Sequence, residues 1–239
     1  MIARALASTD FSTIQIHLTI NTTFKTPVFA LLLLTAPLWC FSQDKKSFLD
    51  AALTQYSNKT IPDILGEEIK MALSFFPELK ETSIDFILKE KINKVTMQAQ
   101  PRIKTLFKKK SRRTYKIKIS KHLNLGEKIK PIEDIPTDIL VGWIAHELGH
   151  IMDYLDRSSF QMIGFGFRYL TSKSFVMNAE RQADVYAINH GFADQIIKTK
   201  NYILNGEEDL SAKYRQRIDL YYISPEEVRI IEEKMESVL

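Results

Sequence analysis

The sequence predicts an α+β fold in which a small mixed sheet is followed by a long buried helix and a helical C-terminal part. Apolar and polar residues alternate with period two in residues 83–89, 95–99 and 113–120, which is typical of half-buried strands. Residues 139–151 are apolar on nearly every side of a helix, and a helix of that kind is buried. The chain after this helix is rich in helical spacing and in helix-capping residues.

The N-terminal region contains the longest apolar stretch of the chain, residues 27–42. Lys25 precedes this stretch and the polar run 42–46 follows it. Its length suits the apolar core of a secretory signal better than a membrane span, which needs about 20 residues. We therefore expect residues 1–43 to be an extension and signal peptide, and residues 44–239 to be one domain exported to the periplasm, cell envelope or outside. The alternative is an uncleaved membrane anchor formed by residues 27–42.

The composition indicates one globular domain with an ordinary core. The chain has 239 residues, of which 45% are hydrophobic, and a formal net charge of +4. Its only cysteine, Cys40, falls within the predicted signal. An exported domain without a thiol has neither a disulfide framework nor a cysteine nucleophile.

The first elements of the domain are two predicted helices and three predicted strands. The helices are expected at 47–58 and 62–76, with Pro77 ending the second. The strand over 113–120 is the clearest because apolar and basic side chains alternate along Tyr115, Lys116, Ile117, Lys118 and Ile119. Its basic outer row predicts a half-exposed or edge strand. Residues 121–135 are expected to form a loop that leads into the buried helix.

Residues 102–121 form a basic segment that contains no acidic residue. Such a segment can steer an acidic substrate or touch an anionic lipid surface. The alternative is a solvated loop and one face of a strand. Nucleic-acid binding is not expected, because only Phe107 and Tyr115 interleave aromatic rings with the basic side chains.

The run His146-Glu147-Leu148-Gly149-His150 carries the clearest chemistry in the chain. On a helix, His146 and His150 lie one turn apart on the same face. Their imidazole nitrogens can then bind one zinc ion, and Glu147 stands where a general base would activate a water molecule. Polar groups in a buried helix need partners, and a metal ion would supply them. Gly149 is expected to let another backbone approach closely.

A second polar pair follows on another predicted helix, which Ser174 would cap and Gly191 would end. Glu180 and Asp184 lie one turn apart there, among small residues. From spacing alone, the pair is either part of the metal site or an acidic pair on a solvated helix face.

The His-Glu-x-x-His run followed by Glu-x-x-Ala-Asp at 180–184 resembles the gluzincin zinc metallopeptidases over residues 136–192. The short chain with a single motif is similar to the minigluzincins. The resemblance implies a zincin-like fold in which Glu180 is the third zinc ligand beside the two histidines. It implies that Asp184 orients His146 by accepting a hydrogen bond, and that the sheet's edge strand pairs with an extended peptide. The metzincin extension His-x-x-Gly-x-x-His is absent.

The resemblance also implies a tyrosine or histidine that steadies the oxyanion. His190 and Tyr186 are nominated because they lie near the glutamate helix. The alternative for His190 is an ordinary place in the last helical turn, where a histidine favours the helix dipole.

The remaining segments are assigned to packing. The strongly apolar connection 158–172 can wall a pocket or touch a membrane, and ordinary core packing is the expected role. Asn205-Gly206 predicts a turn. Ser224-Pro225-Glu226-Glu227 is a capping box that begins a final helix ending near Glu236.

Together these patterns predict an exported zinc-dependent metallopeptidase that hydrolyses peptide bonds in a peptide or protein substrate. Two alternatives stay open. One is a non-catalytic binding or scaffold protein of the cell envelope in which zinc staples two helices. The other is an intracellular metallopeptidase linked to nucleic acid through the basic segment.

Overall fold

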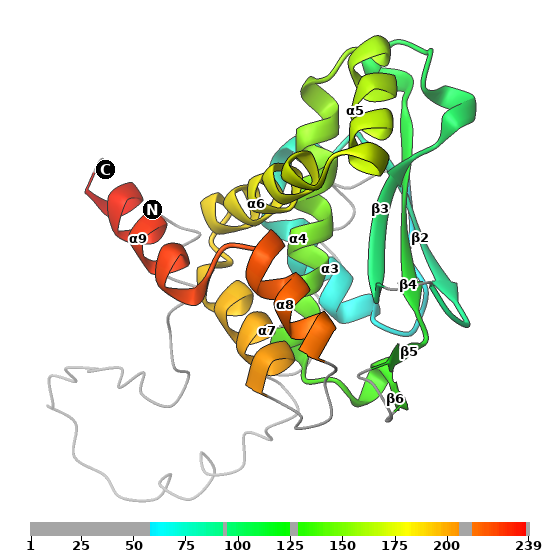
Figure 1. Cartoon of the computed structure of the whole chain (residues 1–239). Helices are drawn as coiled ribbons and strands as arrows, with labels where there is room; N and C mark the ends of the chain where they lie inside the picture. The colour runs from blue at the N-terminus through cyan, green and yellow to red at the C-terminus, as the bar shows by residue number, and fades with distance from the viewer. Residues whose placement is uncertain (1–57, 93–94, 125–128, 206–211, 238–239) are drawn as a thin grey trace, which may run out of the picture.

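The computed structural model describes residues 58–92, 95–124, 129–205 and 212–237. The fold is α+β, as the sequence predicts (Figure 1). Its strands are β1 (Lys59–Thr60), β2 (Ser83–Lys89), β3 (Met97–Pro101), β4 (Thr114–Ser120), β5 (His122–Asn124) and β6 (Ile129–Pro131). Its helices are α3 (Gly66–Ser74), α4 (Thr137–Asp156), α5 (Ser159–Thr171), α6 (Lys173–Asn189), α7 (Ala193–Asn205), α8 (Ala212–Tyr221) and α9 (Pro225–Glu236).

The main sheet is mixed, with the strand order β1-β2-β4-β3. β2 is parallel to both β1 and β4, whereas β3 pairs antiparallel to β4. Tyr115, Ile117 and Ile119 are buried and the lysines between them are half-exposed, so the predicted alternation is confirmed. Of the two predicted positions, half-exposed or edge, the half-exposed one is confirmed and the edge is not, because β4 lies between β2 and β3. The edge beside the helices belongs to β3.

Helix α4 is the centre of the molecule. It packs against β3 on one side and against α3, α6 and α7 on the others (Figure 1). Contacts on all sides explain why its sequence is apolar nearly all round. Two glycines permit the closest of these contacts. A Cβ at Gly142 would lie 2.5 Å from the Gln195 carbonyl oxygen, and one at Gly149 would lie 2.3 Å from the Ala183 carbonyl oxygen. The predicted purpose of Gly149 is therefore confirmed.

The expectation of ordinary core packing for the connection 158–172 is confirmed for only some of its side chains. The segment forms helix α5, whose N-terminus is a capping box between Ser158 and Gln161. Only one side of this helix packs inward, through Met162, Phe165 and Tyr169. Phe160, Ile163 and Phe167 point away from the core and are exposed.

Several element boundaries also differ from those predicted. α3 begins at Gly66, since Leu65 has a left-handed backbone (φ 67°) that an α-helix cannot include. Residues 121–135 are not a plain loop, because β5 and β6 pair antiparallel within them. Ser172, not Ser174, caps α6, and Gly191 follows the helix with φ 87°.

The capping box of the last helix is confirmed at Ser224 and Glu227. The predicted signal and anchor (1–43), residues 47–57 of the first helix and Gly206 of the predicted turn lie outside the described residues. Among the helices that the structure describes, none combines the length and the apolar character needed to cross a membrane.

Candidate metal centre

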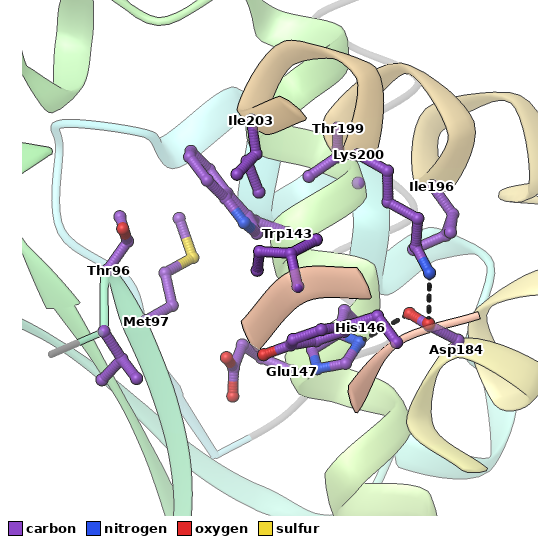
Figure 2. A pocket seen from close by; sticks show the side chains of 14 residues that line it. Thr96, Met97, Trp143, His146, Glu147, Asp184, Ile196, Thr199, Lys200 and Ile203 are labelled. Atoms are coloured by element: carbon purple, nitrogen blue, oxygen red, sulfur yellow. Dashed lines mark hydrogen bonds and ion pairs between the residues drawn. The ribbon is translucent and has the colours of Figure 1, made fainter. Parts of the chain in front are cut away.

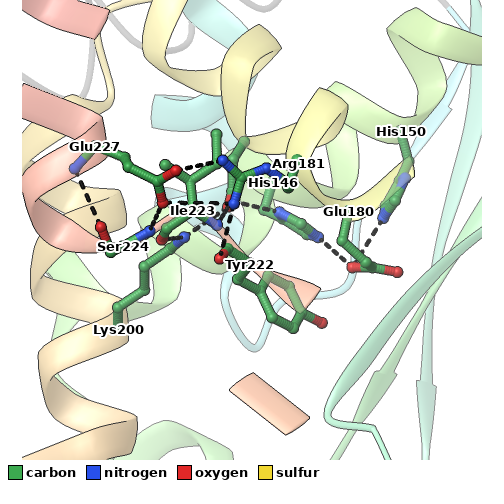
Figure 3. A network of polar contacts seen from close by, with 10 residues as sticks. His146, His150, Glu180, Arg181, Lys200, Tyr222, Ile223, Ser224 and Glu227 are labelled. Atoms are coloured by element: carbon green, nitrogen blue, oxygen red, sulfur yellow. Dashed lines mark hydrogen bonds and ion pairs between the residues drawn. The ribbon is translucent and has the colours of Figure 1, made fainter. Parts of the chain in front are cut away.

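Two imidazole rings and one carboxylate meet between α4 and α6. His146 and His150 are one turn apart on α4, and their rings meet edge to face with centroids 4.8 Å apart. Glu180 on α6 directs Oε2 towards both rings, 3.2 Å from His146 Nε2 and 3.5 Å from His150 Nε2 (Figure 3). All three side chains are buried. This is the ligand set that the resemblance implied.

The spacing of these donors suits a shared metal ion. One ligand atom from each residue lies within 4.8 Å of the others. Two ligand atoms bound at 2.0–2.1 Å to a tetrahedral zinc ion are separated by about 3.3 Å. The observed separations of 3.2 Å and 3.5 Å from Glu180 match that value. The three residues can therefore hold a metal ion, and imidazole with carboxylate is a donor set that suits zinc.

Asp184, one turn after Glu180, forms a hydrogen bond with the ring nitrogen of His146 that faces away from the cluster. Its Oδ1 lies 2.9 Å from His146 Nδ1, which leaves Nε2 directed at the cluster. Its Oδ2 accepts hydrogen bonds from Lys200 Nζ at 2.6 Å and from the Ile223 amide at 3.2 Å. Lys200 also donates to the Ile223 carbonyl oxygen. The position of the imidazole is thus set by a buried network that reaches α7 and the segment before α9.

Tyr169 on α5 holds the other oxygen of the glutamate. Its hydroxyl donates to Glu180 Oε1 at 2.5 Å, so Oε2 is left to face the two histidines. Sequence reasoning missed this contact because residue 169 belongs to the segment that was assigned to core packing. The only signal was a hydroxyl within an otherwise apolar stretch.

The electrostatics of the cluster favour a positive charge at its centre. Burial disfavours a charged His146, but hydrogen bonds to Asp184 and Glu180 outweigh burial and raise the pKa of His146 to about 10. Burial also opposes the charge on Glu180, yet His150 and His146 hold its pKa well below the ordinary value. The pKa of Asp184 is lowered against burial, first by Lys200 and then by His146. Two buried carboxylates therefore stay ionised.

Glu147 lies beside the cluster but is not one of its three donors. Its Oε2 accepts a hydrogen bond from the Ala99 amide of β3 at 2.5 Å, which fixes the carboxylate between the helix and the sheet. Burial is the largest influence on Glu147 and raises its pKa, although the neighbouring His150 opposes the shift. A carboxylate with a raised pKa is a stronger proton acceptor than an ordinary one.

A pocket opens next to the cluster between β3, α4 and α7 (Figure 2). It encloses about 640 Å³, including its open mouth. Its polar lining residues include His146, Glu147, Asp184, Lys200 and Tyr222. The rest of the wall is largely apolar and includes Val95, Met97, Trp143, Ile196, Ile203 and Ile218.

Tyr222 is a pocket residue that sequence reasoning also missed. It follows α8, and its ring centroid lies 5.5 Å from that of His146. Lys200 lies over the same ring, with Nζ 5.6 Å from its centroid. Nothing in the local sequence around 222 distinguishes this tyrosine from those used in packing.

The two nominated oxyanion donors are not brought to the cluster. His190 stacks on Phe76, and its nitrogens contact the Tyr186 carbonyl oxygen at 2.7 Å and Glu78 Oε2 at 3.1 Å. The Tyr186 hydroxyl donates to Asp156 at 3.4 Å. Neither residue lines the pocket. Tyr186 lies on a different face of α6 from Glu180, and His190 follows the end of that helix, so proximity in sequence was misleading.

The fold and the site together define an α+β protein with a buried His-His-Glu cluster that can hold a metal ion. Comparison of the chain with known protein families, with curated proteins and with solved structures finds no match. The chemistry of the cluster therefore has to be argued from its own geometry.

Proposed function

We propose that this protein is a zinc-dependent peptidase of the gluzincin type. The observation that carries the proposal is the convergence of His146, His150 and Glu180 beside a pocket that Glu147 enters from the same helix. A metal that only stapled two helices would need no buried carboxylate next to it. Glu147 is such a carboxylate, and an edge strand holds it in place.

Glu147 is the proposed general base. Held by the three donors, a zinc ion would supply Lewis acidity that lowers the pKa of a nucleophilic water. Glu147 would accept a proton from that water and return it to the leaving amine. Its raised pKa suits both steps, because the protonated form remains accessible.

The substrate proposed is an extended peptide that pairs with β3. Arg102 N donates to Thr114 O, and Ser120 N donates to Thr96 O, both at 2.8 Å. Both bonds join an even-numbered residue of the segment 96–102, which contains β3, to β4 or the residues at its end. Hydrogen-bonded pairs alternate along an antiparallel ladder, so the even-numbered residues of this segment face β4. The backbone groups of Met97 and Ala99 therefore point to the outer edge, where Ala99 N already meets Glu147. A peptide added at that edge runs past the cluster.

The apolar wall of the pocket supports a preference for an apolar side chain next to the scissile bond. Trp143 and Met97 face the pocket from two different elements (Figure 2). Burying an apolar side chain between them is favourable. We propose Tyr222 as the hydroxyl that steadies the oxyanion, in place of His190 and Tyr186, because it lines this pocket and lies near His146.

The proposal predicts that Glu147→Gln keeps the zinc ion and lowers turnover by about 10²–10⁴-fold, since the amide cannot accept a proton. Zinc content by metal analysis and cleavage of an unfolded protein such as casein measure the two effects. Glu133→Gln, an exposed acid before α4, is the matched control and should leave both unchanged. Equal cleavage by Glu147→Gln and the parent would refute the mechanism. Zinc binding by both chains with no hydrolysis would favour the stapled scaffold.

We also propose that the domain is exported and that residues 1–43 are removed, because the apolar stretch 27–42 has the length and flanks of a secretory signal. Mass analysis of the protein recovered from expressing cells should give an N-terminus near Gln43. A retained segment 27–42 would instead indicate the membrane anchor.

A further inference from the structure

Exposed apolar side chains gather at one end of the molecule. Ten large hydrophobic residues are exposed in the part of the chain that the structure describes, and six of them belong to α5 and to the stretch just after β3. We call these six the α5 apolar surface: Ile103, Phe107, Phe160, Ile163, Phe167 and Leu170. Two of them, Phe160 and Leu170, are 82% and 87% exposed. Soluble proteins rarely leave so many large apolar side chains together without an interaction partner.

The residues on α5 form one narrow stripe opposite the core. Positions 160, 163, 167 and 170 fall within about 80° of each other at 100° per residue. Met162 and Phe165 pack inward on the other side of the helix. The helix is thus apolar on two faces, and only one of them is used by the fold.

The stretch after β3 is joined to the start of α5. Ser159 Oγ donates to the Leu106 carbonyl oxygen at 2.7 Å, and Lys110 Nζ donates to the Asp156 carbonyl oxygen at 2.7 Å. Buried Arg113 connects the two segments again through the Arg157 carbonyl oxygen at 2.6 Å. Figure 1 shows α5 and the chain between β3 and β4 at the same end of the molecule. The six apolar side chains therefore belong to one structural unit.

The charge of this unit has a single sign. Residues 102–121 and 157–179 contain no aspartate or glutamate. Exposed basic side chains occur in the same two segments, namely Lys104, Lys108, Lys109, Arg168 and Lys173. Protein interfaces are depleted in lysine, whereas apolar side chains surrounded by lysine and arginine suit the boundary of an anionic bilayer.

We propose that the α5 apolar surface docks this protein on an anionic lipid bilayer. Phe160, Phe167 and their neighbours enter the boundary between headgroups and acyl chains, and the lysines of 104–109 lie over lipid phosphates. Because Tyr169 on the inner face of α5 contacts Glu180, docking would hold the metal centre close to the bilayer. The inference does not depend on the proposed peptidase activity, since lipid binding is measured without a substrate.

The test uses a probe at the proposed contact in the full chain. Cys40→Ser removes the only native cysteine, and Phe167→Cys then carries an environment-sensitive fluorophore. Ile230→Cys, on exposed α9 away from α5, is the matched control. Every variant carries the same Cys40→Ser change and otherwise the same residues 27–42, so any binding by that segment is common to all. Vesicles of phosphatidylcholine with phosphatidylglycerol should shift the emission to the blue at position 167 and not at position 230.

The second arm of the test varies the charge of the protein and the lipid composition of the vesicles. Lys104→Gln, Lys108→Gln and Lys109→Gln together should weaken the vesicle affinity reported at position 167 by roughly a hundredfold, about fivefold for each charge. Neutral phosphatidylcholine vesicles should bind more weakly than anionic ones. The proposal is overturned if position 167 does not respond to anionic vesicles, or if positions 167 and 230 respond equally. It is also overturned if position 167 shifts with protein concentration alone, which would assign the surface to a second copy of the chain.

Discussion

At the scale of single residues, the two carboxylates of α6 have different partners for each of their oxygens. Glu180 gives Oε2 to the histidines and Oε1 to Tyr169. Asp184 gives Oδ1 to His146 and Oδ2 to Lys200. Side chains held at both oxygens have little freedom to rotate, so the donors are already in position before a metal ion binds. Such preorganisation lowers the cost of binding.

The hydroxyl of Tyr169 offers a specific test of this view. Tyr169→Phe keeps the ring and removes only the hydrogen bond to Glu180, so zinc affinity should fall by about 10–100-fold. Competition with a chelating dye measures the affinity. Tyr186→Phe is the matched control, because the hydroxyl of Tyr186 meets Asp156 instead of the cluster. Unchanged affinity in Tyr169→Phe would show that the Glu180 carboxylate does not need this support.

Lys200 shows why Asp184 can be buried and ionised at once. Burial lowers the pKa of the lysine, and the facing carboxylate opposes that shift. Each charged group therefore offsets the cost of burying the other, Asp184 for Lys200 and Lys200 for Asp184. Lys200 is carried by α7 and Asp184 by α6, so the pair also fixes how these two helices lie beside α4 (Figure 2).

At the scale of elements, the contact between α4 and α6 decides whether the ligands meet. Gly149 lies between His146 and His150 in sequence and faces the backbone of Ala183, which lies between Glu180 and Asp184. The two smallest residue types thus occur at the crossing of the helices. The same crossing brings the histidines and the glutamate within reach of one another.

Gly149→Ala should therefore destabilise the fold by about 1–3 kcal/mol, because the added methyl group overlaps a backbone oxygen that cannot move alone. Zinc affinity should fall in the same variant, since α6 has to shift away. Chemical denaturation and metal titration measure the two effects. Gly164→Ala on α5 is the matched control, because nothing lies within 4 Å of its added Cβ. That change should leave stability unchanged or raise it by up to about 1 kcal/mol.

At the scale of the whole molecule, the cluster lies where the sheet and the helical part meet. β3 contacts Glu147 beside the cluster through Ala99, α5 contacts Glu180 through Tyr169, and α7 contacts Asp184 behind His146 through Lys200. A metal ion bound there joins helices α4 and α6, each of which packs on further elements. Binding to the folded state alone stabilises that state.

Zinc at a hundred times its dissociation constant should raise the free energy of unfolding by about 2.7 kcal/mol. For a domain of this size, the midpoint of thermal unfolding should rise by roughly 5–10 °C. Calorimetry with zinc, with magnesium as the control ion, and with a chelator measures the shift. Glu180→Ala should lose most of the zinc effect. A shift of the same size in that variant would remove Glu180 from the ligand set.

The residues whose roles depend on local spacing could be predicted from the sequence alone. Period-two alternation identified β4, and one helical turn relates His146 to His150 and Glu180 to Asp184. Gly149 was also predicted correctly, because a glycine in a buried helix indicates a close neighbour. These inferences hold because helix and strand periodicities are properties of the backbone and do not depend on distant chain segments.

Only the tertiary structure decided which distant residues support the cluster and the carboxylates next to it. Tyr169, Lys200 and Ala99 come from three separate elements, and no spacing in the sequence relates them to the histidines. The same is true of α5, for which the sequence favoured ordinary core packing, whereas the fold covers only one of its faces. Periodicity shows that a face is apolar, but what covers that face depends on how all the elements pack together.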